Sequence, residues 1–198
     1  ILRSLGRVAV AFSGGVDSTF VLKLAVDTLG KENVLAVTGK STSVAAGEFD
    51  DATRLAGEIG SEHLVIETQE FDDPNYLANP TNRCYYCKTE LYTQMTPVIA
   101  ARGYSAIVNG TNADDLGDYR PGLIAAGEHA VRSPAAEAGL TKTEIRTLSA
   151  AWGLPTHDKP ARLNGWRRRT CERRLSRPFA KSATSTSAST CGVFAAAA

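Results

Sequence analysis

A short stretch near the N-terminus, VAVAFSGGVDST, restricts the possible folds of this chain more than any other segment. Residues 8–12 form a continuous apolar run, which is typical of a parallel strand buried on both faces. Gly14 and Gly15 follow, and because glycine has no Cβ both can adopt positive φ and let backbone N–H groups approach an anion. A helix is predicted to begin directly after them, with Ser18 and Thr19 capping its first turn. The stretch therefore predicts a phosphate-binding turn in an α/β fold.

The turn differs from two common phosphate loops, because no Lys follows it and its glycines do not have the G-x-G-x-x-G spacing. It resembles the PP-loop, S-G-G-x-D-S, of the ATP pyrophosphatase superfamily, which is matched by Ser13, Gly14, Gly15, Asp17 and Ser18. The resemblance implies that ATP is cut between its α and β phosphates and that the loop holds the pyrophosphate. The alternative is a glycine-containing turn that binds no ligand. The strand, the complete motif and the helix occur in the right order, which favours ATP binding.

Strands and helices alternate through the following residues. Apolar runs at 34–37, 64–66 and 106–108 predict three further strands, and apolar residues at helical spacing predict helices between them. One such helix carries residues 91–99, and Pro97 within it predicts a break or a kink. The repeated order indicates a parallel sheet with right-handed crossovers and helices on both faces. We therefore expect a Rossmann-like α/β fold of the adenine-nucleotide α-hydrolase class, with the PP-loop after the first strand.

The last regular element is predicted from a capping box, TKTE, at residues 141–144. Ile145, Leu148 and Trp152 then recur on one helical face, and Gly153 ends the helix. We expect Trp152 to belong to the core rather than to a binding site.

Polar residues after the predicted strands indicate where the nucleotide binds, because open α/β sheets bind ligands at the carboxyl ends of their strands. Thr38 and Ser41 follow the second strand and Gly110 follows the fourth, so we expect these three residues to line the nucleoside. Arg120 carries a planar guanidinium group that suits a phosphate or a carboxylate.

The segment NGTNADDLGDYRPG after the fourth strand is unusually acidic. Asp114, Asp115 and Asp118 fall within five residues, close to the expected position of Asp17 in the PP-loop. Carboxylate oxygens are suitable ligands for Mg²⁺, directly or through water, so all four aspartates are candidate metal ligands. The alternative is a charged surface turn with an Asp–Arg pair.

Cys84 and Cys87 form a CxxC motif within NPTNRCYYCK, a segment that we expect to be a loop before a helix. Such a pair can bind a metal, support dithiol chemistry or consist of packed thiols, and an isolated CxxC does not decide among these roles. The two other cysteines form no second metal-binding pair by spacing. Arg83 and Lys88 flank the motif, and their charges would lower the thiol pKa values.

Five segments carry a more specific resemblance: SGGVDST, NPTNRCYYCK, GTNADDLGDYRPG, SPAAEAGLTKTEIR and GLPTHDKPA. Over residues 1–161 the chain is similar to the LarE family of ATP-dependent sacrificial sulfur transferases. The resemblance implies that ATP adenylates a carboxylate of pyridinium-3,5-biscarboxylic acid mononucleotide, for sulfur insertion during biosynthesis of a nickel-pincer cofactor. A Cys thiolate then gives its sulfur to the product. Some members hold an iron–sulfur cluster with three cysteines, which would give Cys84 and Cys87 a role.

The resemblance ends at residue 161, where the composition changes abruptly. Residues 162–198 are first Arg-rich and then rich in Ser, Thr and Ala, and they lack the family segment C-L-x-S-R that carries the sulfur-donating Cys. We interpret them as a disordered, frameshifted or aberrant C-terminus, and the alternative is a genuine basic tail that binds nucleic acid. Cys171 is the nearest sulfur-donor candidate, with Cys84 and Cys87 behind it. We therefore expect this chain to bind ATP and to complete no sulfur transfer.

Composition supports a cytoplasmic enzyme without membrane partners. No apolar run approaches the roughly 20 residues of a membrane span, no signal peptide precedes the first strand, and four Cys suggest thiols or metal ligands rather than disulfides. The expected partners are ATP, Mg²⁺ and a small anionic, nucleotide-like carboxylate, and assembly into homo-oligomers is left open. The alternative functions are another PP-loop adenylating enzyme, of the tRNA thiolase, NAD synthetase or GMP synthetase type, or a nucleic-acid-binding protein that acts through its basic tail.

Overall fold

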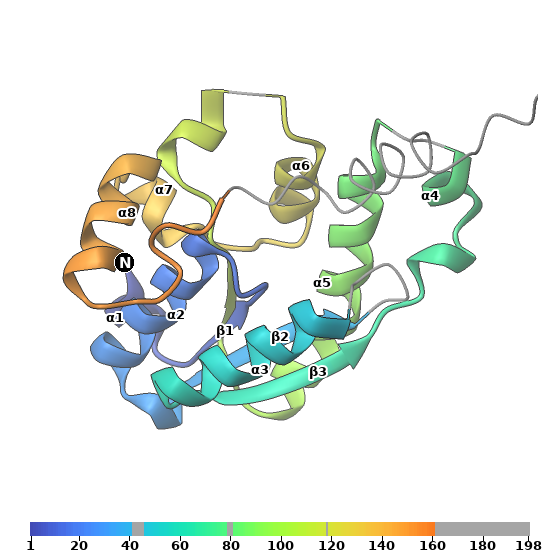
Figure 1. The fold of residues 1–198 in the computed structure, drawn as a ribbon. Helices are drawn as coiled ribbons and strands as arrows, with labels where there is room; N and C mark the ends of the chain where they lie inside the picture. Colours follow the sequence, from blue (N-terminus) through green and yellow to red (C-terminus); the bar gives the residue numbers. More distant parts are fainter. Residues whose placement is uncertain (41–45, 79–80, 118, 161–198) are drawn as a thin grey trace, which may run out of the picture. The chain divides into compact units, whose positions relative to one another are not determined.

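A computed structural model of the chain describes residues 1–40, 46–78, 81–117 and 119–160 (Figure 1). Its centre is a four-stranded parallel sheet formed by β1 (Val8–Ala11), β2 (Val34–Lys40), β3 (Glu62–Glu67) and β4 (Ala106–Val108). The strand order is β3-β2-β1-β4, and β1 pairs with β2 from Val8 opposite Val34 onward. The predicted Rossmann-like α/β class is confirmed.

Helices connect the strands and cover the sheet on both sides (Figure 1). The longer ones are α2 (Val16–Leu29), α3 (Ala46–Ile59), α5 (Arg83–Ala101), α6 (Pro121–Glu128) and α8 (Lys142–Ala151). Short helices complete the fold: α1 (Leu2–Leu5), α4 (Pro74–Ala78), α7 (Pro134–Glu137) and the 3₁₀ turns η1 (Lys31–Asn33), η2 (Glu70–Asp72) and η3 (Ala113–Gly117). Within the described residues, no helix is long and apolar enough to cross a membrane.

Alternate side chains of each central strand enter two separate apolar clusters. Val8 and Val10 of β1 pack with residues of α2, α3 and α8, whereas Ala9 between them packs with residues of α5 and α6. Because successive residues of a strand point to opposite faces, an apolar run without polar interruptions buries both faces of the sheet. The second cluster includes Tyr92 and Met95, which are fully buried.

The strand order places a crevice between β1 and β4. Chain connections from β1 run outward through β2 to β3, and the chain then returns to place β4 on the other side of β1. Ligands of open α/β sheets bind at this reversal, outside the carboxyl ends of the strands. The PP-loop follows β1 and Asn109 and Gly110 follow β4, so both line this crevice.

Helix α5 continues through Pro97 to Ala101, so the chain does not break there, and a kink at Pro97 stays a prediction. The Thr96 hydroxyl donates a 2.8 Å hydrogen bond to the Tyr92 carbonyl. The expected loop RCYYCK is instead the first two turns of α5, which begins after Asn82. Cys84 and Cys87 therefore lie on a helix.

The capping box of α8 is present as predicted. Thr141 accepts a hydrogen bond from the backbone N–H of Glu144, and the Glu144 carboxylate accepts one from the Thr141 N–H. Trp152, however, is 38% exposed and stacks on Phe20 with ring centroids 5.2 Å apart, so it covers the core from the surface rather than lying inside it.

Arg146 of α8 holds the segment that follows the helix. Its guanidinium donates one hydrogen bond to the carbonyl of His157 (2.6 Å) and another to the carbonyl of Lys159 (2.7 Å). The Lys159 ammonium in turn pairs with Asp51 of α3 at 3.1 Å. These contacts fix the last described residues across α8 and α3. Residues 161–198, with Cys171, lie outside the described part of the chain.

Candidate functional site

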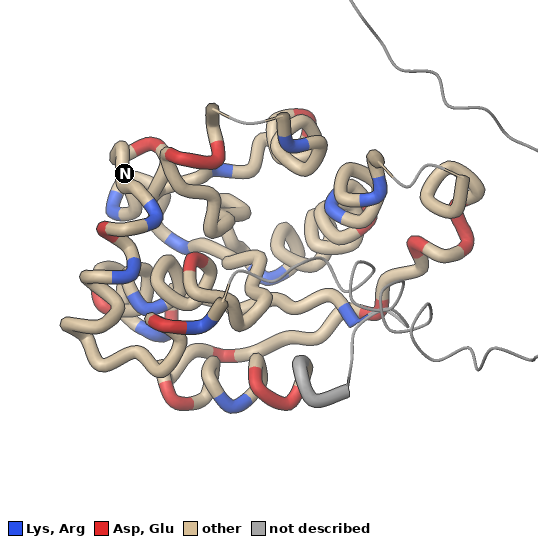
Figure 2. Tube along the Cα trace, turned by 45° about the horizontal axis from the view of Figure 1, so that its top comes forward, with Lys and Arg blue, Asp and Glu red and all other residues tan. Residues whose placement is uncertain are grey.

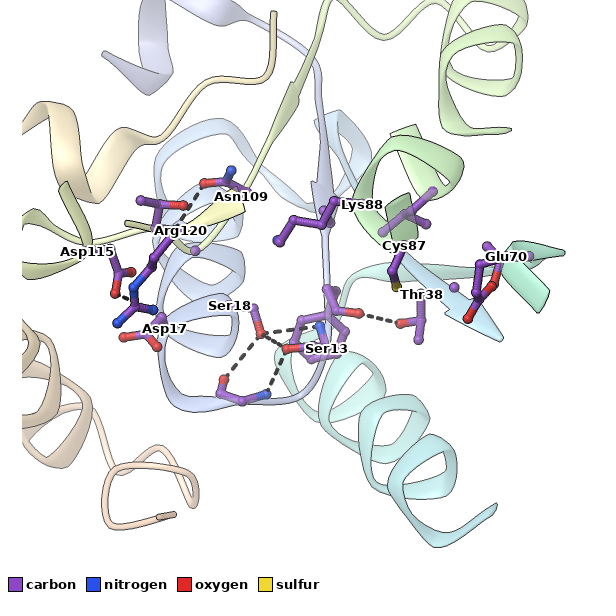
Figure 3. A pocket seen from close by; sticks show the side chains of 18 of the residues that line it. Ser13, Asp17, Ser18, Thr38, Glu70, Cys87, Lys88, Asn109, Asp115 and Arg120 are labelled. Carbon is purple, nitrogen blue, oxygen red and sulfur yellow. Dashed lines mark hydrogen bonds and ion pairs between the residues drawn. The ribbon is translucent and has the colours of Figure 1, made fainter. Parts of the chain in front are cut away.

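A cavity of about 340 Å³ lies at the carboxyl end of the sheet (Figure 3). Its wall combines the PP-loop, the ends of β2 and β4, and the first turns of α5. The candidate residues that line it are Ser13, Gly15, Asp17, Ser18, Thr38, Cys87, Gly110, Asp115 and Arg120. Ser41 and Asp118 lie outside the described residues. Most of the candidates predicted from sequence are therefore brought together in one cavity.

The two glycines of the PP-loop have different roles. Gly14 adopts φ +67°, and a Cβ at this position would lie 3.3 Å from the Ala52 Cα of α3. Gly15 has φ −82° and ψ 169°, an extended conformation that any residue adopts. Of the two glycines, only Gly14 uses the positive φ that glycine allows, because one left-handed residue suffices to turn the strand into the helix.

Serine side chains brace the loop from inside. The Ser18 hydroxyl donates to the Gly15 carbonyl (3.3 Å), accepts from the Ser13 N–H (3.3 Å) and lies 3.1 Å from the Ser13 hydroxyl. The predicted capping of α2 by Ser18 and Thr19 is wrong: Gly15 is the N-cap, without a side-chain cap, and Thr19 is fully buried. The first N–H groups of α2 thus keep no side-chain acceptor, which is the arrangement that binds phosphate.

Gly110 brings the end of β4 against the start of α2. A Cβ on Gly110 would lie 2.6 Å from the Ser18 backbone nitrogen and 2.8 Å from the Asp17 carbonyl carbon. Such a contact with backbone is impossible without displacing the PP-loop helix. Gly110 therefore sets the distance between the end of β4 and the first turn of α2. This role adds to the predicted one of lining the nucleoside.

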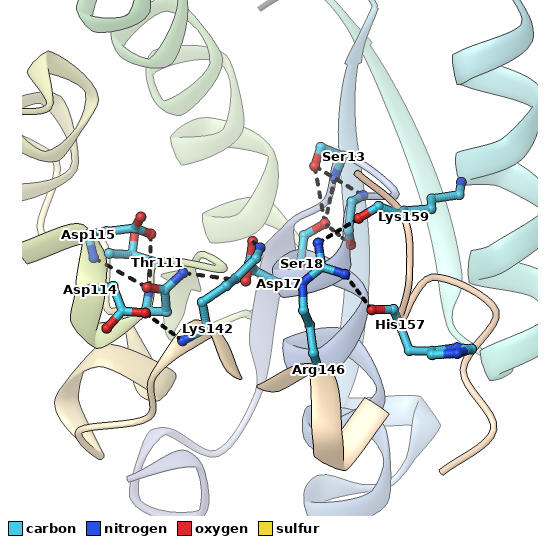
Figure 4. A network of polar contacts seen from close by, with 12 residues as sticks. Ser13, Asp17, Ser18, Thr111, Asp114, Asp115, Lys142, Arg146, His157 and Lys159 are labelled. Carbon is cyan, nitrogen blue, oxygen red and sulfur yellow. Dashed lines mark hydrogen bonds and ion pairs between the residues drawn. The ribbon is translucent and has the colours of Figure 1, made fainter. Parts of the chain in front are cut away.

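Asp17 is the centre of a polar network (Figure 4). Its Oδ2 forms an ion pair with the Lys142 ammonium, and its Oδ1 accepts a 3.4 Å hydrogen bond from the Asn112 side chain. Lys142 is the first residue of α8, 125 positions from Asp17 in the sequence. Sequence reasoning identified the capping box TKTE but not this lysine, because only the packing of α8 on α2 brings it to the loop. The available sequence signal was the position of Lys142 inside the capped first turn of α8.

Asp114 and Asp115 already have protein partners. Asp114 accepts a 2.9 Å hydrogen bond from the Lys142 N–H. Asp115 accepts one from the Asn112 N–H at 3.1 Å and pairs with Arg120 at 2.8 Å. Within the described residues, no three His, Cys, Asp or Glu side chains are placed to hold a metal together.

Thr38 lines the cavity where the nucleoside is expected, and His63 contacts Thr38. The Thr38 hydroxyl donates to the Phe12 carbonyl at 2.8 Å, so its oxygen accepts from His63 Nε2, also at 2.8 Å. Burial lowers the pKa of His63, which keeps the ring neutral at pH 7. A neutral ring with its proton on Nε2 therefore orients Thr38, and sequence reasoning missed this residue.

The α5 wall contributes Cys87 and Lys88 to the cavity. Desolvation, with smaller contributions from Glu70 and Cys84, raises the pKa of the Cys87 thiol to about 12. For Cys87 this is opposite to the expectation that nearby positive charge lowers the thiol pKa, because desolvation of the sulfur outweighs the charge of Lys88.

Comparisons with known proteins agree with this architecture. The family profile described as NAD synthase matches residues 3–78. The chain is 49% identical over 157 residues to the uncharacterized protein slr1717 of Synechocystis, and 40% identical over 160 residues to the pyridinium-3,5-bisthiocarboxylic acid mononucleotide synthase of Lactiplantibacillus plantarum. These alignments cover 79% and 81% of this chain, and 58% of each relative's length. The structure of an NH₃-dependent NAD synthetase from Campylobacter jejuni superposes with a TM-score of 0.57 at 25% identity, covering 75% of this chain and 65% of that one.

Proposed function

This chain belongs to the LarE-type sulfur transferase family of PP-loop ATP pyrophosphatases, and we propose that residues 1–160 form an ATP-dependent adenylating domain. The acceptor we propose is a carboxylate of pyridinium-3,5-biscarboxylic acid mononucleotide, the acid that corresponds to the product in the name of the Lactiplantibacillus relative. A carboxylate oxygen attacks the α-phosphorus of ATP, the bond to the β-phosphate breaks, and pyrophosphate leaves. The acyl-adenylate is then ready for sulfur transfer. Free thiols and the use of ATP suit an enzyme of the cytoplasm.

The observation that carries the proposal is the shape of the anion site. Uncapped N–H groups of α2 and the braced PP-loop lie at one end of the cavity, and the Lys142 ammonium pairs with Asp17 of this loop. Donors in such a preorganised array stabilise negative charge that develops on a leaving group. Pyrophosphate gains negative charge as its bond to the α-phosphorus breaks. Donors at this end of the cavity therefore favour cleavage between the α and β phosphates.

Mg²⁺ fits this site through few protein ligands. Asp17 lines the cavity with a carboxylate whose side chain is 25% exposed, and Asp115 also lines the wall. Mg²⁺ usually binds one or two carboxylates together with substrate phosphates and water. We propose Asp17 as its protein ligand, with Asp114, Asp115 and Asp118 acting through water; the ion would neutralise phosphate charge.

The products of ATP cleavage test the proposed function. We expect AMP and pyrophosphate, in equal amounts, when the chain is incubated with Mg-ATP and the pyridinium dicarboxylate nucleotide, as followed by ³¹P NMR. Nicotinic acid adenine dinucleotide with ammonia serves as the control acceptor for an NAD synthetase. Release of ADP and phosphate would show that the PP-loop assignment is wrong. Preferential use of the control acceptor would indicate that the chain is an NAD synthetase instead.

A cluster at Cys84 and Cys87 is the second part of the proposal. The thiols lie three residues apart on α5, one of them on the cavity wall, so an iron–sulfur cluster bound there would face the nucleotide. The described residues supply two cysteines, and a third ligand must come from elsewhere. Because the Cys87 pKa is about 12, binding must displace a proton, and cluster occupancy should rise with pH.

Anaerobic reconstitution tests the cluster. We expect broad absorbance near 400 nm with iron and sulfide in the wild-type chain and its loss in Cys84→Ser and Cys87→Ser. Cys171→Ser and Cys191→Ser test the two remaining cysteines as the third ligand. Equal absorbance in the wild type, Cys84→Ser and Cys87→Ser would contradict a cluster at α5.

A further inference from the structure

Lys88 is a cation on the wall of the proposed ATP cavity, and it has no carboxylate partner among the residues that the structure describes. Lys23, Lys40, Lys142 and Lys159 each pair with a carboxylate. Lys88 lines the cavity from α5, and no Asp or Glu of the described residues lies within ion-pairing distance of it. Its positive charge therefore faces a space that is built to hold a ligand (Figure 3).

Two neighbours fix the position of this side chain. The Lys88 ammonium lies 5.8 Å from the centre of the Tyr92 ring, at the distance of a cation–π contact. On the other side, α6 presses on the aliphatic stem: a Cβ at Gly122 would lie 2.7 Å from Lys88 Cδ and 2.9 Å from Cε. The aliphatic stem of Lys88 therefore lies in the space left by the missing Cβ of Gly122.

Removing an ammonium group from water costs free energy unless an anion or hydrogen bonds replace its hydration. The Lys88 side chain is partly buried, and its stem lies against Gly122 of α6. Its cation–π contact compensates only part of the lost hydration, so the site is ready for a negatively charged ligand.

The arrangement of the cavity indicates which anion binds. The PP-loop, with Lys142 paired to its Asp17, forms the proposed pyrophosphate end, and Thr38 lines the proposed nucleoside side. In phosphoryl and nucleotidyl transfer the attacking and leaving oxygens lie roughly in line through phosphorus. The acid must then approach from a part of the wall other than the PP-loop, and the α5 part of the wall carries the cation Lys88.

We propose that Lys88 binds the carboxylate of the acceptor and holds it in line with the α-phosphorus of ATP. The inference rests on the proposed function, and it adds a residue that selects an aromatic acid over a neutral acceptor. The ammonium also offsets repulsion between the two anions that must meet, which an uncharged side chain does not.

A pair of binding measurements tests the proposal without turnover. The probes are α,β-methylene-ATP, which resists cleavage at the relevant bond, and pyridine-3,5-dicarboxylate, both titrated by calorimetry in the presence of Mg²⁺. We expect Lys88→Met to weaken dicarboxylate binding by about 10- to 100-fold, the loss of one charge-assisted hydrogen bond, and to change affinity for the ATP analogue by less than about 3-fold. Lys88→Arg should recover part of the loss, and Lys23→Met is the surface control.

Each other outcome has a separate meaning. If Lys88→Met loses affinity equally for both probes, Lys88 is an ATP ligand and the inference is overturned. Unchanged dicarboxylate affinity in Lys88→Met would also overturn it. The same holds if the wild-type chain binds only the ATP analogue. A wild-type chain that binds neither probe would overturn the proposed function itself.

Gly122→Ala tests the same point while it keeps the charge. The new Cβ must displace the flexible Lys88 stem, so dicarboxylate binding should fall by a similar factor although the lysine is present. Gly127→Ala on the same helix is the matched control, because no atom lies within 4 Å of its added Cβ. Equal binding by both alanine variants would contradict the proposed position of Lys88.

Discussion

Replacing Gly110 with alanine is expected to abolish measurable ATP binding, with the dissociation constant for α,β-methylene-ATP rising at least about 100-fold. The added Cβ would lie 2.6 Å from the Ser18 nitrogen and 2.8 Å from the Asp17 carbonyl carbon. Both neighbours are backbone atoms of the first turn of α2, so no side chain can rotate away. Relief of the overlap must push α2 from β4 and tilt the N–H groups that bind phosphate.

The same substitution should also destabilise the fold, because overpacking of a rigid contact costs roughly 1–3 kcal/mol. Gly127→Ala is the control: it adds the same methyl group in open space on α6 and should be neutral or slightly stabilising. Calorimetric titration measures affinity and urea unfolding measures stability. If Gly110→Ala binds the analogue as tightly as Gly127→Ala, then β4 does not set the width of the crevice.

Replacing Lys142 with methionine is expected to lower the rate of pyrophosphate release at least about 100-fold, the usual effect of removing one preorganised charge donor from an anion site. Lys142 is the only described cation that pairs with the PP-loop carboxylate Asp17. Methionine keeps the length of the aliphatic stem, and the capping box formed by Thr141 and Glu144 remains to hold α8.

Two measurements distinguish a lost charge from a damaged fold. The Lys142→Met chain should unfold within a few degrees of the wild type, whereas ATP turnover, measured as pyrophosphate, should nearly disappear. Lys23→Met on α2 removes another lysine that pairs with a carboxylate, Asp27, and should leave turnover unchanged, because surface substitutions of this kind have small effects. Full turnover by Lys142→Met would show that this ammonium does not contact the phosphates.

Local patterns were enough to predict the sheet and the PP-loop. Each strand is an apolar run that must be buried on both faces, and the fourth strand, Ala106–Val108, has the predicted bounds. The positive φ of Gly14 also follows from a local rule, since the strand must reverse into a helix within four residues. The membership of the LarE family, inferred from five short segments, is confirmed by the 40% identical relative.

The remaining features depend on packing between distant segments. Lys142 reaches Asp17 only because α8 packs on α2, and His63 reaches Thr38 only through the pairing of β2 with β3. The charge of the acidic loop is visible in the sequence, but the partners of its aspartates are not. Asp114 accepts from the N-terminus of α8, and Asp115 pairs with Arg120. RCYYCK was assigned to a loop because turn-forming residues precede it, and these residues instead lead into α5.

Helix α8 holds two distant points at once. Lys142 in its first turn contacts the PP-loop carboxylate, and Arg146, one turn later on the same side, holds the carbonyls of His157 and Lys159. One helix therefore joins the PP-loop carboxylate to the last described residues, up to 160, through two side chains that lie a single turn apart.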